Sequence, residues 1–279
     1  MRRADRLFRL VQRLRRRGVT TAKALAEELE PADLVVANNV LAHVPDINDF
    51  VAGIARLLKP TGRASIECPH LLRLLAGNQF DTIYHEHFSY LSLLAVQRIF
   101  AHHGLTLFDV EEVPTHGGSL RIYAQHTDTP ARKPTGAVEA LLERERAAGY
   151  FELDGYRGFG PKVEETKFKI LEFLIGAKRA GKSVVGYGAP GKGNTLLNYC
   201  GIRTDFLDYT VDRNPFKHGK FCPGSHIPIF DVPKIKETKP DYLFILPWNL
   251  KDEIINQMSY IREWGGQFVV PVPEITVYP

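Results

Sequence analysis

Repeated alternation of short apolar runs with amphipathic helical stretches is the feature that most constrains this chain. The run from Leu34 to Ala37 is apolar throughout, which is typical of a central parallel strand buried on both faces. Helical stretches with an apolar period of about 3.6 residues follow this run and recur along the chain. Strands that alternate with helices form parallel sheets covered by helices, so the sequence predicts an α/β fold.

The length of 279 residues suits two domains of ordinary size. The stretch 127–136 is rich in Thr, Pro, Lys and Gly, as expected of a linker. We therefore expect one domain over residues 32–130 and a second over 137–279, preceded by a basic helical segment over 1–31. The predicted elements are strands at 34–37, 64–67, 105–113, 119–125, 183–187, 206–211, 242–245 and 268–270, helices at 48–58, 94–103, 138–150 and 161–180, and a turn at 59–62.

Arginines crowd residues 2–17, where leucines and a valine at helical spacing predict an amphipathic helix. A second helix through Leu25 and Leu29 gives the segment a resemblance to the opening of a winged-helix repressor. The recognition helix of such a repressor should come next, but Pro31 is followed at once by a strand pattern. A solvated basic helix or a fusion remnant is therefore the favoured interpretation, and nucleic acid is not an expected partner.

Composition narrows the class of protein. Apolar residues make up 44% of the chain and charged residues 24%, the balance of a soluble globular protein. No apolar run approaches the roughly 18 residues of a membrane helix, and no signal peptide is visible, so the expected compartment is the cytoplasm. Cys68, Cys200 and Cys222 are too few and too scattered for a disulfide framework or a zinc site. The net charge of +4 suits a phosphorylated substrate.

Groups that can move protons gather between residues 84 and 90. This stretch holds His85 and His87, the carboxylate of Glu86 and a tyrosine at each end. Histidine titrates near neutral pH, a neighbouring carboxylate can orient it, and a phenol can donate to a developing oxyanion. A metal site formed with His43 is the alternative, but such sites normally need three suitable ligands, and no cysteine is near. Acid–base chemistry without a metal is therefore favoured.

A glycine-rich turn follows an apolar strand pattern in the second half of the chain. Residues 186–191 read G-x-G-x-x-G, and Asp212 ends another strand about twenty residues on, which is the pattern of a dinucleotide site such as that for NAD. Pro190 within the turn is unusual for NAD, whereas Lys192 and the helix start near Asn194 suit a phosphate group. A turn that only lets a helix pack on a strand is a further alternative.

Three stretches resemble the C-methyltransferases that act on nucleotide-linked deoxysugars, a family that uses S-adenosylmethionine. They are Glu67-Cys68-Pro69, Tyr84-His85-Glu86-His87 and Thr115–Arg121, and the likeness runs from about Asp33 to the C-terminus. Residues 33–46 also resemble the fourth strand of class I methyltransferases and the loop after it. The resemblance implies methylation at carbon 3 of a thymidine-diphosphate 4-keto sugar by way of an enolate.

The same resemblance implies roles for individual residues. His87 is the expected general base, with Tyr84 and Glu86 beside it, and His43 is expected next to the reacting centre. The methyl donor is expected at the strand end, and the nucleotide diphosphate is expected in the C-terminal domain. The expected cofactor residues are Ala37, Asn38 and Asn39, and the expected substrate residues are Tyr90, His116, Gly188, Lys192, Asn194, Asn198, Asp212 and Trp248.

The chain departs from the family pattern at its start. Three features of the family are not found in this sequence. They are the cysteine-rich zinc-binding domain, the first glycine-rich loop and the acidic residue that holds the cofactor ribose. We therefore expect a truncated or fused chain, with an incomplete class I methyltransferase (Rossmann-like) domain followed by a second Rossmann-like α/β domain. In such a sheet the strand at 34–37 loses a neighbour, and an unpaired apolar edge promotes aggregation. The base loop is present, but most of the cofactor site is missing.

Three other functions stay open on the sequence. A nucleotide-sugar-binding protein without catalysis would use only the C-terminal domain. A NAD-dependent oxidoreductase would use the glycine turn, and a DNA-binding regulator would use the basic N-terminus. The expected partner is a nucleotide-diphosphate sugar, no membrane is expected, and the sequence gives no indication of the oligomeric state or of the particular sugar.

Overall fold

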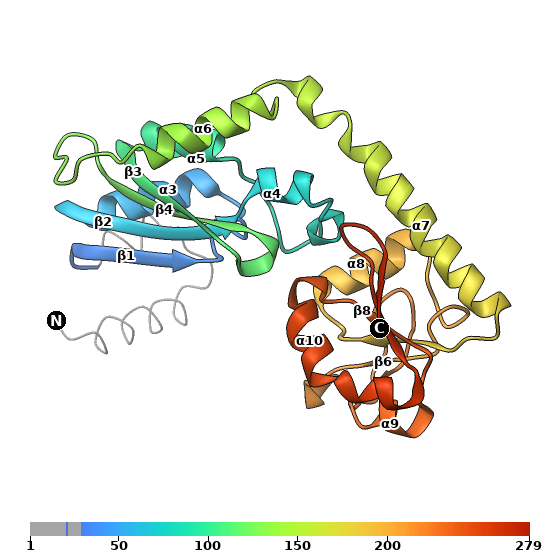
Figure 1. The fold of residues 1–279 in the computed structure, drawn as a ribbon. Helices are drawn as coiled ribbons and strands as arrows, with labels where there is room; N and C mark the ends of the chain where they lie inside the picture. The colour runs from blue at the N-terminus through green and yellow to red at the C-terminus, as the bar shows by residue number, and fades with distance from the viewer. Residues whose placement is uncertain (1–20, 22–28) are drawn as a thin grey trace. The chain divides into compact units, whose positions relative to one another are not determined.

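A computed structural model describes Thr21 and residues 29–279, and its chain divides into two compact units (Figure 1). The first unit holds the described residues up to Arg73 together with Glu86–Tyr156. The second holds Leu74–His85 and Arg157–Pro279, so the chain leaves the first unit, returns to it and leaves it again. Apart from Thr21 and residues 29–31, the predicted basic helical segment lies outside the described residues.

The first unit combines a mixed sheet with helices that bury their apolar sides. Its longer elements are β1 (Ala32–Asn38), α3 (Ile47–Leu57), β2 (Leu58–Pro69), α5 (Leu93–His102), β3 (Leu105–Val113), β4 (Ser119–His126) and α6 (Ala137–Ala147). The strand order is β1-β2-β4-β3, with β1 parallel to β2 and the other pairs antiparallel. Ile66 of β2, Ile122 of β4 and Phe100 of α5 are fully buried in its core, which confirms the α/β class for this unit.

Two features of this sheet differ from the prediction. The expected turn at 59–62 belongs to β2, and it is accommodated by a shift in register between Ala32 and Leu34 of β1. β1 lies at the edge of the described sheet, where the sequence predicts a missing neighbour, but it is not buried on both faces, since Leu34 is 47% and Val36 57% exposed. An apolar run predicts that a strand is present, but it does not reveal how many neighbours the strand has.

The second unit is built on a parallel sheet in the order β10-β9-β8-β5-β6-β7, and among its described strands only β10 is antiparallel to its neighbour. Its strands are β5 (Val184–Tyr187), β6 (Thr210–Val211), β7 (Ile229–Phe230), β8 (Tyr242–Ile245), β9 (Gln267–Val270) and β10 (Thr276–Tyr278). Its longer helices are α7 (Phe159–Arg179), α8 (Gly191–Cys200), α9 (Lys234–Thr238) and α10 (Lys251–Gln257). The fully buried Phe244, Phe268 and Leu196 form part of the core.

The strand predicted at 206–211 is shorter than expected. Only Thr210 and Val211 pair within the sheet, because the N–H groups of Phe206 and Leu207 donate to the carbonyl of Arg203 in a turn. The apolar residues of this stretch therefore pack in the core, although only its last two residues form a strand.

Residues 74–85 belong to the second unit although they lie between the two parts of the first in the chain. This segment, which we call the anchor segment, contains the end of α4 (Leu71–Ala76) and a 3₁₀ turn over Phe80–Thr82. Phe80 is 5% exposed and packs in the core of the second unit, with its ring 5.2 Å from that of Tyr199. The amide of Asn78 donates to the hydroxyl of Thr166 in α7 at 2.6 Å. Apolar burial and buried hydrogen bonds therefore fix the segment to this unit.

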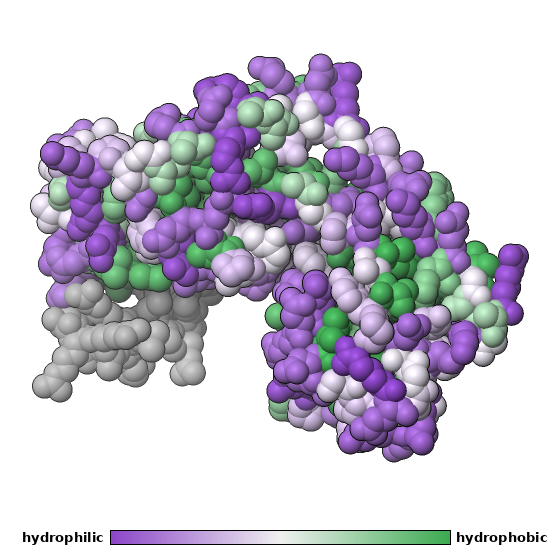
Figure 2. Space-filling view, in the orientation of Figure 1, coloured by the Kyte–Doolittle hydropathy of each residue, from purple (hydrophilic) through white to green (hydrophobic). Residues whose placement is uncertain are grey.

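Hydrophilic side chains cover most of the face shown in Figure 2, with smaller groups of hydrophobic ones between them. In the part of the chain that the structure describes, no helix combines the length and the apolar character needed to cross a membrane. The three cysteines are buried and not joined in disulfides, and burial raises the pKa of the Cys68 thiol to about 12.

A buried carboxylate ties α6 to the start of α5. Glu145, which is 1% exposed, accepts the N–H of Leu93 at 2.6 Å and that of Leu94 at 3.1 Å. It also lies 2.9 Å from the Nε2 atom of the buried His70, just after β2. An acidic side chain at the start of a helix satisfies free N–H groups there and interacts favourably with the helix dipole. One side chain thus connects three elements of the first unit.

We predict that Glu145→Ala destabilises the protein strongly, because it leaves two N–H groups and His70 buried without their acceptor. The free energy of unfolding should fall by about 3 kcal/mol, measured by urea denaturation with circular dichroism as the probe. Glu143→Ala on the same helix is the matched control, since its side chain is 65% exposed and pairs only with Arg146. An equal loss in the two variants would contradict the role given to Glu145.

Candidate active site

The loop that follows β1 is fastened to the loop that carries His87. The N–H groups of Phe88 and Ser89 both donate to the carbonyl of Ala42, at 2.8 and 3.2 Å. Ala42 and its neighbour Leu41 are buried, so the acceptor is held by the core of the first unit. Residues distant in the sequence are therefore placed side by side by backbone bonds, which do not depend on side-chain identity.

Two imidazoles meet at this junction. The rings of His43 and His87 lie edge to face with their centroids 4.6 Å apart, and the ring of Tyr90 lies 5.9 Å from that of His87. Nδ1 of His43 lies 2.8 Å from the carbonyl oxygen of Glu86. Because a carbonyl only accepts, Nδ1 carries the proton, and Nε2 is the basic nitrogen of a neutral His43 ring. The structure thus brings His43, His87 and Tyr90 into one row of groups that can exchange protons.

The predicted cofactor residues lie at the end of β1, next to this row in the sequence. Ala37 and Asn38 pair with Ile66 and Glu67 of β2, and Asn39 adopts a left-handed conformation with φ 56°. The N–H of Asn39 donates to the carbonyl of Glu67 at 2.8 Å. Its side-chain amide oxygen is buried without a hydrogen-bond partner. A buried acceptor of this kind suits a ligand that carries a donor group.

The turn between β3 and β4 is fastened to the end of β2. Glu67, which is 4% exposed, accepts the hydroxyl of Thr115 at 2.8 Å and the guanidinium of Arg121 at 3.0 Å. Two of the three stretches that carried the family resemblance therefore form one hydrogen-bonded group. His116, at the tip of the same turn, is exposed and adopts φ 56°.

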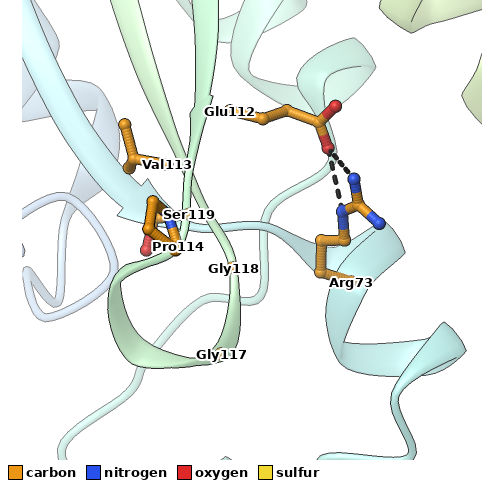
Figure 3. A pocket seen from close by; sticks show the side chains of 7 residues that line it. All are labelled: Arg73, Glu112, Val113, Pro114, Gly117, Gly118 and Ser119. Atoms are coloured by element: carbon orange, nitrogen blue, oxygen red, sulfur yellow. Dashed lines mark hydrogen bonds and ion pairs between the residues drawn. The ribbon is translucent and has the colours of Figure 1, made fainter. Parts of the chain in front are cut away.

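A surface pocket of about 460 Å³ lies beside this turn (Figure 3). Arg73 reaches into its wall and pairs with Glu112 at 2.9 Å. Arg144 and Arg73 hold the pKa of Glu112 below its usual value, against the opposing effect of burial. A Cβ at Gly118, where φ is 123°, would lie 2.8 Å from the side chain of Arg73, so this position favours glycine. The lining residues are Arg73, Glu112, Val113, Pro114, Gly117, Gly118 and Ser119.

The glycine turn of the second unit connects β5 to α8. Gly188 has φ 84°, and a Cβ there would lie 2.7 Å from Pro247. The carboxylate of Asp212 braces the turn by accepting the N–H of Ala189 at 2.8 Å and the ammonium of Lys217 at 2.9 Å. Burial opposes ionisation, but these bonds and one from the N–H of Asn214 hold the pKa of Asp212 below its usual value. The acidic residue of the fingerprint is thus engaged within the protein, which disfavours its use on the ribose of NAD.

The two predicted asparagine ligands have different surroundings. The amide of Asn198 donates to the carbonyls of Asn194 and Pro223, at 2.8 and 2.9 Å, so it supports a neighbouring loop. The amide of Asn194 donates to the carbonyl of Pro190 at 3.2 Å, while its oxygen is buried without a partner. Asn194 therefore retains an acceptor for a ligand, whereas both hydrogen bonds of the Asn198 amide group are made within the protein.

Lys192 and Trp248, both predicted as substrate residues, meet a residue that sequence reasoning missed. The ammonium of Lys192 lies 4.4 Å from the centre of the Trp248 ring and donates to the amide oxygen of Asn249 at 2.8 Å. The indole N–H of Trp248 donates to Asp81 of the anchor segment at 2.7 Å. Burial raises the pKa of Asp81 to about 6, although Trp248 and Lys192 oppose this effect. The signal that could have identified Asp81 in the sequence was its charge, placed directly after the aromatic Phe80.

The remaining residues of the predicted base loop are divided between the units. Tyr84 belongs to the second unit, and a Cβ at Gly191 would lie 3.3 Å from its ring, so the phenol ring packs at the start of α8. Glu86 belongs to the first unit, where its side chain is exposed and its carbonyl holds His43. Among the residues that the structure describes, no group of three or more His, Cys, Asp or Glu side chains could hold a metal ion.

The chain matches two known protein families. Residues 114–273, more than half of its length, match a family described as the C-methyltransferase C-terminal domain. Residues 4–110 match a second family, described as a methyltransferase domain. The two matches follow one another along the chain and together extend over most of it.

Individual proteins also resemble the chain. C-methyltransferase NovU of Streptomyces niveus is 39% identical over 267 residues, which cover 92% of this chain but only 63% of that protein. Among solved structures, the PH0226 protein of Pyrococcus horikoshii OT3 has a TM-score of 0.32 at 17% identity, over 42% of this chain and 64% of its own. A Burkholderia thailandensis 1,6-didemethyltoxoflavin-N1-methyltransferase, solved with bound 1,6-didemethyltoxoflavin and S-adenosylhomocysteine, has a TM-score of 0.29 at 20% identity, over 37% of this chain and 48% of its own.

We predict that Asp81 makes stability depend on pH. Its pKa in the folded protein, about 6, exceeds the usual 3.8, so ionisation destabilises the fold above pH 6 and has little effect below pH 4. Asp81→Asn removes the ionisable group. The free energy of unfolding of this variant minus that of the parent chain should therefore be about 2 kcal/mol larger at pH 7.5 than at pH 4.5. Urea denaturation at the two pH values measures the difference. Asp205→Asn, at an exposed position, is the control and should show no such difference between the two pH values. The absence of a difference for Asp81→Asn would contradict a raised pKa of Asp81.

Proposed function

The chain belongs to the C-methyltransferase family described by this C-terminal domain, and we propose that it transfers a methyl group from S-adenosylmethionine to carbon 3 of a nucleotide-linked keto-deoxysugar. The observation that carries the proposal is the pair of His43 and His87, held at the end of β1 by backbone hydrogen bonds. The activity of the relative NovU, named as a C-methyltransferase, agrees with it.

The proposed reaction begins with proton transfer to a histidine. A carbon next to a ketone is acidic because its anion is an enolate, and His87 takes that proton. The electron pair of the carbon–hydrogen bond would then form the bond to the methyl group that S-adenosylmethionine would supply, with S-adenosylhomocysteine as the second product. General-base help of this kind contributes roughly 10²- to 10⁴-fold in rate. The ring contact between His43 and His87, and the orientation of His43 by the carbonyl of Glu86, support a further role of His43 beside the base.

The residues at the end of β1 fit the methyl donor. S-adenosylmethionine carries amino groups that donate hydrogen bonds, and the buried amide oxygen of Asn39 is an acceptor without a partner. Asn39 would therefore hold a donor group of the cofactor, with Ala37 and Asn38 beside it in β1. Bound there, the cofactor supplies an electrophilic methyl group.

The second unit supplies the proposed site for the nucleotide diphosphate. The start of α8 has no side-chain cap, and the first N–H groups of such a helix suit a phosphate. Lys192 brings a positive charge to the same turn, and Asn194 offers a further polar group. A nucleotide-sugar-binding protein without catalysis would use this same site, so the proton-transfer step decides between the two functions.

We predict that the chain catalyses exchange of the carbon 3 proton of thymidine-diphosphate-4-keto-6-deoxyglucose with solvent deuterium. His87→Asn should slow this exchange by about 10²- to 10⁴-fold, because it removes the general base. Proton nuclear magnetic resonance in deuterium oxide, without any methyl donor, measures the exchange apart from cofactor binding. A blank without protein gives the rate of spontaneous enolisation.

His102→Asn is the matched control, since this histidine is exposed at the end of α5 and lies outside the proposed site. Its exchange rate should equal that of the parent chain. Binding of the nucleotide sugar without exchange above the blank would favour the non-catalytic function. Equal rates for the parent chain and His87→Asn would exclude His87 as the base.

A further inference from the structure

Asp81 is a buried carboxylate with half of its hydrogen-bonding capacity unused. The residue is 0% exposed, and one of its oxygens accepts the indole N–H of Trp248 at 2.7 Å. The other oxygen is buried and has no partner. Burying an ionised carboxylate with an unsatisfied oxygen is unfavourable, so a neutral amide side chain, which can also accept the indole N–H, would serve the fold alone at least as well. The position therefore points to a role beyond packing.

The indole of Trp248 connects Asp81 to the start of α8. Asp81 bonds the edge of the indole ring, and the ammonium of Lys192 lies 4.4 Å from the centre of the same ring. Burial lowers the pKa of Lys192, and the negative charge of Asp81 opposes that effect. The charges of the two residues therefore act on each other through a poorly solvated region, where electrostatic interactions are stronger than in water.

We propose that Asp81 is a positioning residue for the diphosphate site, which acts through Trp248 and Lys192 and gives up its negative charge when a diphosphate binds. The inference rests on the proposed binding of a nucleotide diphosphate at α8. While Asp81 is ionised, its negative charge attracts the ammonium of Lys192 and repels an anion. Once it is protonated, the charge of Lys192 is available to the ligand, and the carboxyl group gains an O–H that can donate a hydrogen bond.

The other groups that face Asp81 do not titrate in the same range. Trp248 carries no ionisable group, and burial raises the pKa of the Cys200 thiol to about 12, so this thiol stays neutral. The positive charge of Lys167 also acts on Cys200 and is retained in an Asp81 variant. His85 and His218 belong to the same unit and are retained in an Asp81 variant, so comparison with that variant removes their effect.

The experiment measures binding of thymidine-diphosphate-glucose by isothermal titration calorimetry at pH 5.5 and 7.5 and constant ionic strength. The diphosphate of this probe is a diester and does not change charge in that range. The dissociation constant of the parent chain should be lower at pH 5.5 by on the order of tenfold. Asp81→Asn should bind with similar affinity at both pH values, and Asp205→Asn should retain the tenfold difference. At pH 6.5, in buffers of different ionisation enthalpy, binding should take up protons in the parent chain and fewer in Asp81→Asn.

A second variant keeps the inference testable if Asp81→Asn does not fold. Trp248→Phe removes the donor that favours the ionised carboxylate, so the midpoint of the pH dependence should move upward. An unchanged pH dependence in Asp81→Asn, or in Trp248→Phe if only that variant folds, would overturn the inference while leaving the proposed function intact. Absence of binding by the parent chain at both pH values would overturn the inference and the proposed nucleotide site together.

Discussion

The hydrogen bond between Asp81 and Trp248 joins residues that lie 167 positions apart in the chain, and the second unit depends on it. It fixes the anchor segment beside α8, with Phe80 packed in the core next to it. The same contact sets the charge around Lys192 and places Tyr84, three residues further on, at the start of the helix. One buried polar contact thus serves both the packing of this unit and the chemistry proposed for it.

In the first unit, polar groups are likewise held by the backbone and by buried carboxylates. Glu145 fixes the start of α5, and Glu67 fixes the turn between β3 and β4. The loop of His87 is attached through main-chain bonds to Ala42. Rigid supports keep reacting groups in a productive geometry. A loop held by these contacts therefore suits the proposed proton transfer better than a loosely held loop would.

Local patterns in the sequence predicted much of the fold. Alternating apolar residues located the pair β3 and β4, and the glycines located the turn before α8, since both signals depend on neighbouring residues alone. Sequence reasoning missed Asp81, and it could not show that Asp212 braces its own glycine turn. Both depend on contacts between distant parts of the chain, as does the exposure of Leu34 and Val36 in β1. The row of His43, His87 and Tyr90 was predicted as a set of residue types, and the structure supplies its geometry.

The discontinuity of the second unit has a consequence for the order in which the protein folds. The anchor segment leaves the ribosome long before β8 and Trp248 are synthesised, so its apolar residues must wait for their partners. Contacts between such distant parts of the chain slow folding, because a long loop has to close before they form. A fragment that starts at Arg157 lacks Phe80 and leaves the indole N–H of Trp248 without its acceptor, so we expect the C-terminal half alone to be less stable than the same half in the full chain.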